Sequence, residues 1–92
     1  MTKRIPANVQ IPPMVWKDLT PQGKALLSYL NTTGSITQRD AILDLGVQSL
    51  TKRIHELRAF YVIVSDTRRH KTTGQRYVRY FLKSLRDQYR EF

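Results

Sequence analysis

The 92-residue sequence predicts one small domain of the α+β class, in which three helices are followed by a β-hairpin. Three observations predict this class. Apolar residues recur at helical spacing in three segments between Thr20 and Leu57, and two later segments, which begin at Val62 and Tyr77, are β-branched or alternate in polarity. Glycines stand at the ends of the helical segments, where the chain must turn. A hydrophobic content of 40% is too high for a disordered chain.

Residues 1–17 are predicted to form an N-terminal arm. The arm contains Pro6, Pro12 and Pro13, which lack a backbone donor and bias the residues before them away from helix. We expect its larger apolar residues to lie across the body of the domain, which spans residues 18–83. These arm residues are Ile11, Met14, Val15 and Trp16. Lys3 and Arg4 are expected to stay free.

The first helix has clear start and stop signals. Thr20 can cap its exposed amides, Pro21 suits the first helical position, and Gly34 can end it in a left-handed conformation. Its apolar face consists of Leu26, Leu27 and Leu30.

The second helix follows a short extended link at residues 35–36. It starts at Thr37 with a capping box in which Asp40 replaces the preferred Glu or Gln. Gly46 closes it within about two turns. Its inward residues are predicted to be Ala41, Ile42 and Leu45.

A third helix is predicted at about residues 48–59, with Gln48 or Ser49 as its cap. Its buried stripe has helical spacing and consists of Val47, Leu50, Ile54 and Leu57. Two helices joined by a glycine-containing turn, the second of them basic, form the helix-turn-helix pattern, whose second helix enters the major groove of DNA. An ordinary helical hairpin gives the same pattern, so the segments that follow decide between the two.

Two strands are predicted after this helix, one at residues 62–64 and one at residues 77–82. The second alternates, with Val78, Tyr80 and Leu82 on one face and Tyr77, Arg79 and Phe81 on the other. We assign Tyr80 to the core. Gly74 suits the turn of the loop between the strands.

The charge is concentrated in this hairpin. The chain has a net charge of +9, and the segment from Thr67 to Lys83 contains no acidic residue. Its basic residues are Arg68, Arg69, Lys71, Arg76, Arg79 and Lys83. A helix-turn-helix followed by a basic hairpin is the winged helix-turn-helix arrangement, in which the hairpin reaches the DNA backbone or the neighbouring minor groove. Order and charge therefore predict a protein that binds double-stranded DNA.

The run from Ser35 to Ala41, the tripeptide Leu45-Gly46-Val47 and the run from Arg53 to Arg58 resemble the small helix-turn-helix domains of phage and prophage genomes. The resemblance covers about residues 22–82 and ends in Tyr80-Phe81-Leu82. The family usually has glycine after its Leu-Arg-x segment, where this chain has Phe60. The resemblance implies a DNA-binding domain of phage or prophage type.

The third helix is expected to read DNA bases with the residues opposite its buried stripe. The preferred readers are Gln48 and Lys52, because Gln pairs with adenine and Lys donates to guanine, with Ser49, Thr51 and His55 nearby. Solvated positions on an ordinary helix are the alternative for each of them. We expect Glu56 to pair with Lys52.

Contacts to the DNA backbone are expected from the wing, which covers residues 66–76, and from its flanks. The predicted residues are Arg53, Arg58, Arg68, Arg69, Lys71, Thr72, Thr73, Arg76 and Arg79. Arg53 has an alternative role inside the protein, pairing with Asp40 or Asp44. The aromatic residues Tyr77, Tyr80 and Phe81 suit stacking with unpaired bases as an alternative to core or wing support. An arm in the minor groove through Lys3 and Arg4 is a further alternative.

Neither catalysis nor a cofactor is expected. The sequence has no cysteine, its two histidines lie on separate elements, and its carboxylates are not clustered as a metal-dependent nuclease requires. The absence of cysteine favours a reducing compartment, and no signal peptide or membrane span is seen. We therefore expect a non-enzymatic protein in the cytoplasm of a bacterial host cell, associated with its nucleoid and not with a membrane.

The C-terminal tail, residues 84–92, is predicted to form a short amphipathic helix through Leu85, Tyr89 and Phe92. Its partner is either the first helix of the same chain or the tail of a second subunit in a homodimer.

The sequence thus predicts a DNA-binding regulator of phage or prophage type. The alternatives are an architectural, excisionase-like or replication-associated DNA-binding factor, and a winged helix that binds a host protein. We expect the third helix and the wing to project from the same side of the molecule.

Overall fold

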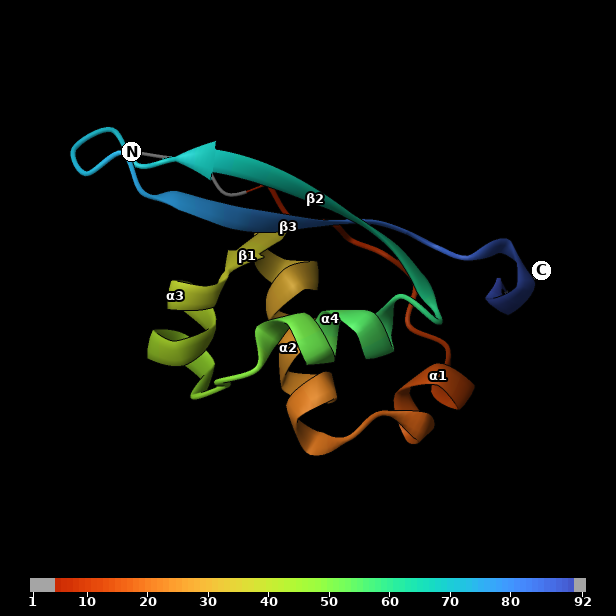
Figure 1. The fold of residues 1–92 in the computed structure, drawn as a ribbon. Coiled ribbons are helices and arrows are strands. Elements are labelled where there is room, and N and C mark those ends of the chain that lie inside the picture. Colours follow the sequence, from red (N-terminus) through yellow and green to blue (C-terminus); the bar gives the residue numbers. More distant parts are fainter. Residues whose placement is uncertain (1–4, 91–92) are drawn as a thin grey trace.

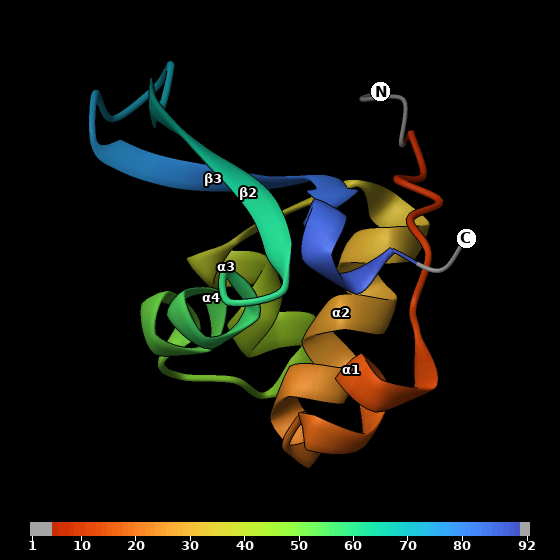
Figure 2. The same ribbon diagram turned by 90° about the vertical axis from the view of Figure 1, so that its right-hand side faces the viewer.

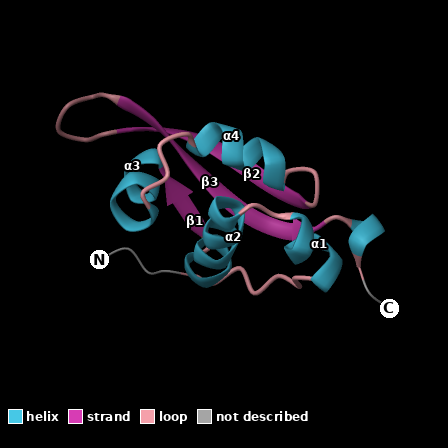
Figure 3. Cartoon of the chain, turned by 90° about the horizontal axis from the view of Figure 1, so that it is seen from below, coloured by secondary structure: helices cyan, strands magenta, loops and turns pink. Residues whose placement is uncertain are grey.

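The computed structural model describes residues 5–90, which form an elongated α+β domain of 46 × 22 × 20 Å. The helices lie on one side of a three-stranded antiparallel sheet with the strand order β1-β3-β2 (Figure 1). The predicted order of helices and hairpin is present. The tip of the hairpin projects beyond the helices, which is clear when the domain is seen from below (Figure 3).

The N-terminal segment differs from the predicted arm because it contains a helix, α1 (Pro13–Asp18), with Pro13 at its first position. Of the predicted apolar contacts, Val15 is fully buried and Ile11 packs against the core. Met14 is 59% exposed, so its predicted burial is wrong. The short helix turns only one of its faces to the body. Lys3 and Arg4 lie outside the described residues.

The segment before α1 runs beside α2 (Pro21–Thr33), where Asn31 holds it (Figure 2). The carbonyl oxygen of Asn31 accepts hydrogen bonds from the amides of Ala7 and Asn8, and its side chain accepts one from the amide of Val9 at 2.7 Å. Asn8 takes a φ of 51°, the one positive value among the non-glycine residues described. The start of the described chain is therefore attached to the domain.

The helix α2 has the predicted signals. The Thr20 side chain accepts from the amide of Gly23, Pro21 begins the helix, and Gly34 ends it in the left-handed conformation. Its buried residues include the predicted Leu26, Leu27 and Leu30.

The second predicted helix is divided into α3 (Gln38–Asp40) and the π-helical turn η1 (Ala41–Leu45). The capping box between Thr37 and Asp40 is confirmed, and Gly46 ends the segment in the left-handed conformation. Ala41 is buried, but Ile42 is 50% exposed, so its predicted inward position is wrong. A π-turn is wider than an α-turn and rotates the residues after its start away from the positions that α-helical spacing predicts.

The helix α4 (Leu50–Leu57) is shorter at both ends than the predicted 48–59. The predicted stripe is confirmed, because Val47, Leu50, Ile54 and Leu57 are all buried. Ala59 and Phe60 make the turn into the sheet with hydrogen bonds to Glu56 and Leu57, and without a positive φ.

The two predicted strands are present and longer, β2 (Tyr61–Arg69) and β3 (Arg76–Leu85). The extended link became a third strand, β1 (Ser35–Thr37), because it pairs with residues 79–81 of β3. A bulge leaves Lys83 unpaired between the pairs Val62–Ser84 and Ile63–Leu82. This extra residue lets Leu82 and Leu85, three positions apart, both reach the core. Tyr80 packs against the core as predicted.

The predicted tail helix is wrong. Strand β3 continues through Leu85, which pairs with Tyr61, and one 3₁₀ turn, η2 (Asp87–Tyr89), follows it. The ring of Tyr89 packs edge-on against Phe60 of the same chain, with 5.2 Å between the ring centres. Phe92 lies outside the described residues. Within the described part of the chain, no helix has both the length and the apolar character that a membrane crossing requires.

Candidate nucleic-acid interface

The residues predicted to read bases extend from the turn before α4 to the last turn of the helix, where His55 lies. Thr51, Lys52 and His55 are on the helix, whereas Gln48 and Ser49 precede its first residue. All five are exposed, whereas the opposite side of the helix is buried. All five are therefore open to a ligand.

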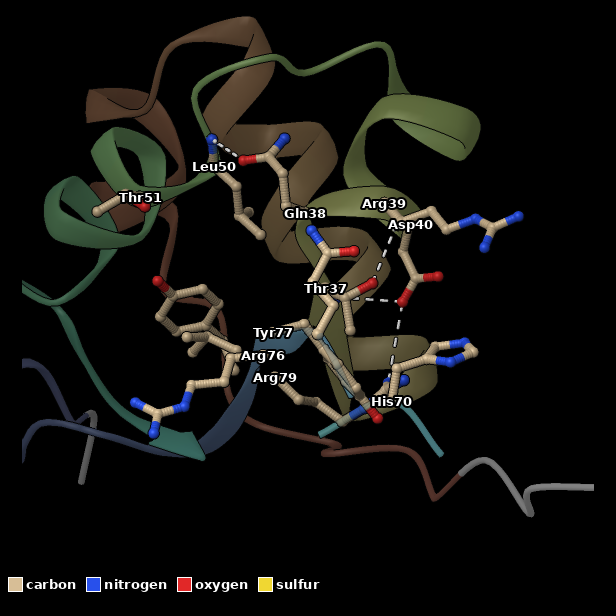
Figure 4. Close-up of a pocket in the computed structure, with 13 residues that line it drawn as sticks. Thr37, Gln38, Arg39, Asp40, Leu50, Thr51, His70, Arg76, Tyr77 and Arg79 are labelled. Atoms are coloured by element: carbon tan, nitrogen blue, oxygen red, sulfur yellow. Dashed lines mark hydrogen bonds and ion pairs between the residues drawn. The ribbon is translucent and has the colours of Figure 1, made fainter. Parts of the chain in front are cut away.

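The turn into α4 is held by Gln38, the first residue of α3. Its side-chain oxygen accepts a hydrogen bond from the amide of Leu50 at 3.2 Å, and its side-chain nitrogen donates to the carbonyl of Val47 at 3.3 Å. Figure 4 shows this side chain reaching the start of α4. The predicted capping role of Ser49 is wrong, because Ser49 makes no side-chain cap within the described residues and Gln38 satisfies the Leu50 amide instead.

The wing is a regular hairpin closed by a short loop. The amide of His70 donates to the carbonyl of Gln75, and the amide of Gly74 donates to the carbonyl of His70. Gly74 takes a φ of 71°, as a turn glycine does. Lys71, Thr72 and Thr73 are exposed at the tip, where the Thr73 hydroxyl also accepts from the amide of Gln75.

The basic residues of the hairpin stems are divided between the two faces of the sheet. Residues that lie opposite each other on paired strands share a face. The pairs Arg69–Arg76, Thr67–Val78 and Ser65–Tyr80 alternate in register with the buried pair Ile63–Leu82, and so lie on the inner face, toward the helices. The pairs Arg68–Tyr77 and Asp66–Arg79 lie on the outer face. Arg69 and Arg76 therefore face the side of α4, and Arg68 and Arg79 do not.

A groove of about 660 Å³ joins the start of α4 to the wing. It is lined by residues of α3, by Leu50 and Thr51 of α4, and by His70, Gln75 and Arg76 of the wing (Figure 4). The expectation that the third helix and the wing share one side of the molecule therefore agrees with this geometry. We call this hollow the helix–wing groove.

Arg53 and Arg58 are engaged within the protein. Arg53 pairs with Glu56 at 3.2 Å and its side chain is 14% exposed. The predicted pairings of Arg53 with Asp40 or Asp44, and of Glu56 with Lys52, are therefore wrong. On a helix the residues three and four positions earlier both lie within reach of Glu56, and it pairs with Arg53, three positions earlier. Arg58 donates from Nε to the carbonyl of Ile63 at 3.3 Å and lies over the ring of Tyr80.

Arg79 takes the carboxylate that Arg53 was expected to take. Its guanidinium donates to the Ser35 hydroxyl at 3.0 Å and lies 3.8 Å from the Asp40 carboxylate. Asp44 instead accepts from the hydroxyl of Tyr29 at 2.8 Å. The hairpin is thus linked to the capping box of α3, and three of the predicted backbone-binding arginines support the fold.

Arg68, the other wing arginine of the outer face, is held by Asp66 at 2.8 Å. This hydrogen bond raises the pKa of Arg68. Both side chains are about half exposed, so the pair contributes little to stability and can be exchanged for a stronger anion.

Sequence reasoning missed Arg39, which is exposed and lines the helix–wing groove. No local pattern indicates Arg39, because α3 has only three residues and its faces cannot be recognised from the sequence. The described residues contain no group of three His, Asp or Glu side chains placed to hold a metal ion.

The fold and this surface together define a winged helix-turn-helix domain, with α4 and a basic wing on either side of one groove. Comparison with protein families agrees: residues 21–84 match the family described as winged helix-turn-helix domain, and the chain belongs to that family. Neither curated proteins nor solved structures gave a match. Membership of this family supports a DNA-binding role for the protein.

Proposed function

We propose that the protein is a transcriptional regulator of phage or prophage type that binds double-stranded DNA with α4 in the major groove. The wing contacts the backbone or enters the adjacent minor groove. The observation that carries this proposal is the helix–wing groove, in which the start of α4 and the inner side of the wing form one concave surface. The origin and the regulatory role rest on the resemblance of the motifs around Thr37, Gly46 and Ile54 to phage helix-turn-helix domains.

Base reading is assigned to five exposed residues in α4 and in the turn before it: Gln48, Ser49, Thr51, Lys52 and His55. In helix-turn-helix proteins the N-terminal residues of the recognition helix contact the base edges; the first four residues lie there, whereas His55 lies in the last turn of α4. Gln48 has the donor and the acceptor that pair with adenine, and Lys52 has the donors that pair with guanine.

Backbone contacts are assigned first to the inner face and tip of the wing, at Arg69, Lys71, Thr72, Thr73 and Arg76. Arg39 joins them because it lines the same groove. Arg53, Arg58 and Arg79 act mainly by holding α4 and the hairpin in place, since their guanidinium groups have partners inside the protein. A DNA-binding protein of this kind acts in the bacterial cytoplasm, on the nucleoid.

The proposal is tested by selecting bound sequences from a random duplex library and then measuring affinity for the selected site. Lys52→Ala is expected to weaken binding about 5- to 100-fold and to relax preference at one base position. Arg76→Ala should weaken binding to all duplexes alike. Lys17→Ala, which removes the same charge from exposed α1, is the matched control. Binding by the Lys52 and Arg76 variants that equals the control would contradict the interface.

Other outcomes separate the alternatives. Salt-sensitive binding without a selected motif, together with strong bending of the duplex, indicates an architectural or replication-associated factor. Absence of any duplex affinity indicates a winged helix that binds a host protein.

Homodimerisation through the tail stays a prediction. The Tyr89 ring is already packed on Phe60 of its own chain, which reduces the apolar surface that a second subunit would cover. The mass of the protein in solution and on its DNA site gives the number of subunits, and a palindromic selected site would accompany a dimer.

A further inference from the structure

The outer face of the sheet, turned away from the helices, carries a second basic surface. The pairs Ser35–Phe81, Val64–Phe81 and Arg68–Tyr77 place these side chains on this face. A hollow of about 460 Å³ lies over it, between the sheet and the N-terminal segment at residues 5–7. The sheet residues that line it are Ser35, Arg68, Tyr77, Arg79, Phe81, Leu82 and Lys83. We call this hollow the outer cleft.

Aromatic rings and cations are interleaved along the outer cleft. The guanidinium of Arg68 lies 5.4 Å from the centre of the Phe81 ring, and the Lys83 ammonium lies 5.6 Å from it. Both cations are exposed and Phe81 is half-buried. A base can therefore take the place of one cation against the ring, while that cation moves to a phosphate. Guanidinium planes such as that of Arg68 also accept stacked bases.

We propose that the outer cleft binds a single strand of nucleic acid, with bases stacked on Phe81 and Tyr77 and phosphates paired with Arg68 and Lys83. Cations alone would fit the backbone of a duplex equally well, but a duplex hides the faces of its bases. Rings interleaved with cations favour unpaired bases. Tyr77 and Phe81 are four residues apart on one strand, about 13 Å, so one strand of several nucleotides can reach both rings.

This surface goes beyond the proposed function, because it lies on the opposite side of the sheet from α4 and does not require duplex binding. A protein with both surfaces holds a duplex in the helix–wing groove and an unpaired strand in the outer cleft at the same time. Tyr77 and Arg79 line both hollows, so they do not distinguish the two. Phe81, Lys83 and Arg68 line the outer cleft and not the helix–wing groove.

The test measures the binding of a labelled oligodeoxythymidine of about ten nucleotides by fluorescence anisotropy, beside the binding of a duplex. Phe81→Leu keeps the apolar bulk and removes the ring, and it is expected to weaken single-strand binding about 5- to 100-fold. Phe81→Tyr should restore it. Lys83→Ala should weaken it further and reduce its salt dependence. Thermal unfolding of each variant verifies that the fold is kept.

Variants on the inner face of the wing are the matched controls for the outer-face variants. Arg69→Ala and Arg76→Ala should weaken duplex binding and leave oligodeoxythymidine binding within about twofold, the reverse of the outer-face variants. Equal single-strand affinity of Phe81→Leu and the unaltered protein would overturn the proposal. So would displacement of the oligonucleotide by a saturating duplex, or polyglutamate binding that Phe81→Leu weakens equally. Failure of duplex binding alone would reject the proposed function and leave this inference standing.

Discussion

At the scale of single residues, Gly34 is a position where any side chain would be strained. It has a φ of 85°, and a Cβ added to it would collide with the carbonyl oxygen of Ile5 in the N-terminal segment. The same residue also donates its amide to Leu30 and accepts from the amide of Leu82. Gly34 thus ends α2 where the N-terminal segment and β3 both approach.

Gly34→Ala is predicted to lower the free energy of unfolding by more than the roughly 1–2 kcal/mol that a left-handed φ costs a residue with a Cβ. The excess comes from displacement of residues 5–7. Gly46→Ala is the control, because Gly46 has a φ of 67° and no atom within 4 Å of an added Cβ. Urea unfolding of both variants measures the difference. Equal losses would show that the contact with Ile5 carries no energy.

Tyr61 is fully buried at the start of β2, and its hydroxyl donates to the carbonyl of Gln10 at 2.9 Å. Burial raises the pKa of Tyr61 from 10.0 to about 12. Because the folded state holds the phenol proton more tightly than the unfolded state, this contribution is complete below pH 10 and is lost as the pH rises toward 12.

We predict that the stability of the unaltered protein falls between pH 10 and 12 by about 2 kcal/mol more than that of Tyr61→Phe. At pH 7 the variant should be less stable by about 1 kcal/mol, since it lacks the hydrogen bond to Gln10. Unfolding curves at both pH values give the comparison. Parallel pH profiles for the two proteins would reject a buried phenol as the cause.

At the scale of elements, the helix-turn-helix depends on one side chain. Gln38 bonds both Val47 and Leu50, which are the two sides of the turn between η1 and α4. The position of α4 and of the exposed residues at its start therefore depends on Gln38, a residue of α3 that belongs to neither.

Gln38→Ala is predicted to destabilise the domain by about 1–2 kcal/mol, because the Leu50 amide loses its partner. Duplex affinity should fall further than the loss of folded protein explains, since the start of α4 is no longer fixed. Gln22→Ala, at an exposed position of α2, is the control for the same substitution. Unfolding measurements and duplex titrations are made on both. Full duplex affinity in a folded Gln38→Ala protein would remove the positioning role.

Elements with local signals could be predicted from the sequence, and elements that depend on distant partners could not. The cap at Thr20, the box at Thr37 and the stripe of α4 involve residues a few positions apart. Strand β1, by contrast, exists because it pairs with β3 more than forty residues later. The π-turn at Ala41 and the helix α1 are short, so their own residues give little periodicity to detect.

At the scale of the whole molecule, the sheet separates the positive charge into two surfaces. Arg69 and Arg76 face the helices, whereas Arg68 and Lys83 border the outer cleft. The net charge of +9 is therefore not available to one duplex as a unit. This division changes the expected number of phosphate contacts.

The salt dependence of duplex binding is predicted to reflect the phosphate contacts made by the inner face and the tip of the wing. With about five phosphates neutralised, the logarithm of affinity should fall against the logarithm of salt with a slope near −4 to −5. Arg69→Ala and Arg76→Ala should each reduce this slope by about one, and Arg68→Ala should leave it unchanged. Titration of duplex at several salt concentrations makes the measurement. An equal change of slope in all three variants would show that both faces of the wing contact the duplex.

The sequence by itself determined the α+β class, the helix-turn-helix with its buried stripe, and the basic hairpin, because period, caps and turn residues act over a few positions. It also predicted that the five residues are exposed, since the side opposite a buried stripe is open. Only the tertiary structure decided which carboxylate each arginine takes, that Gln38 holds the turn, and that the wing arginines are divided between two faces. These depend on strand register and on contacts between segments far apart in the chain, for which a local pattern carries no information.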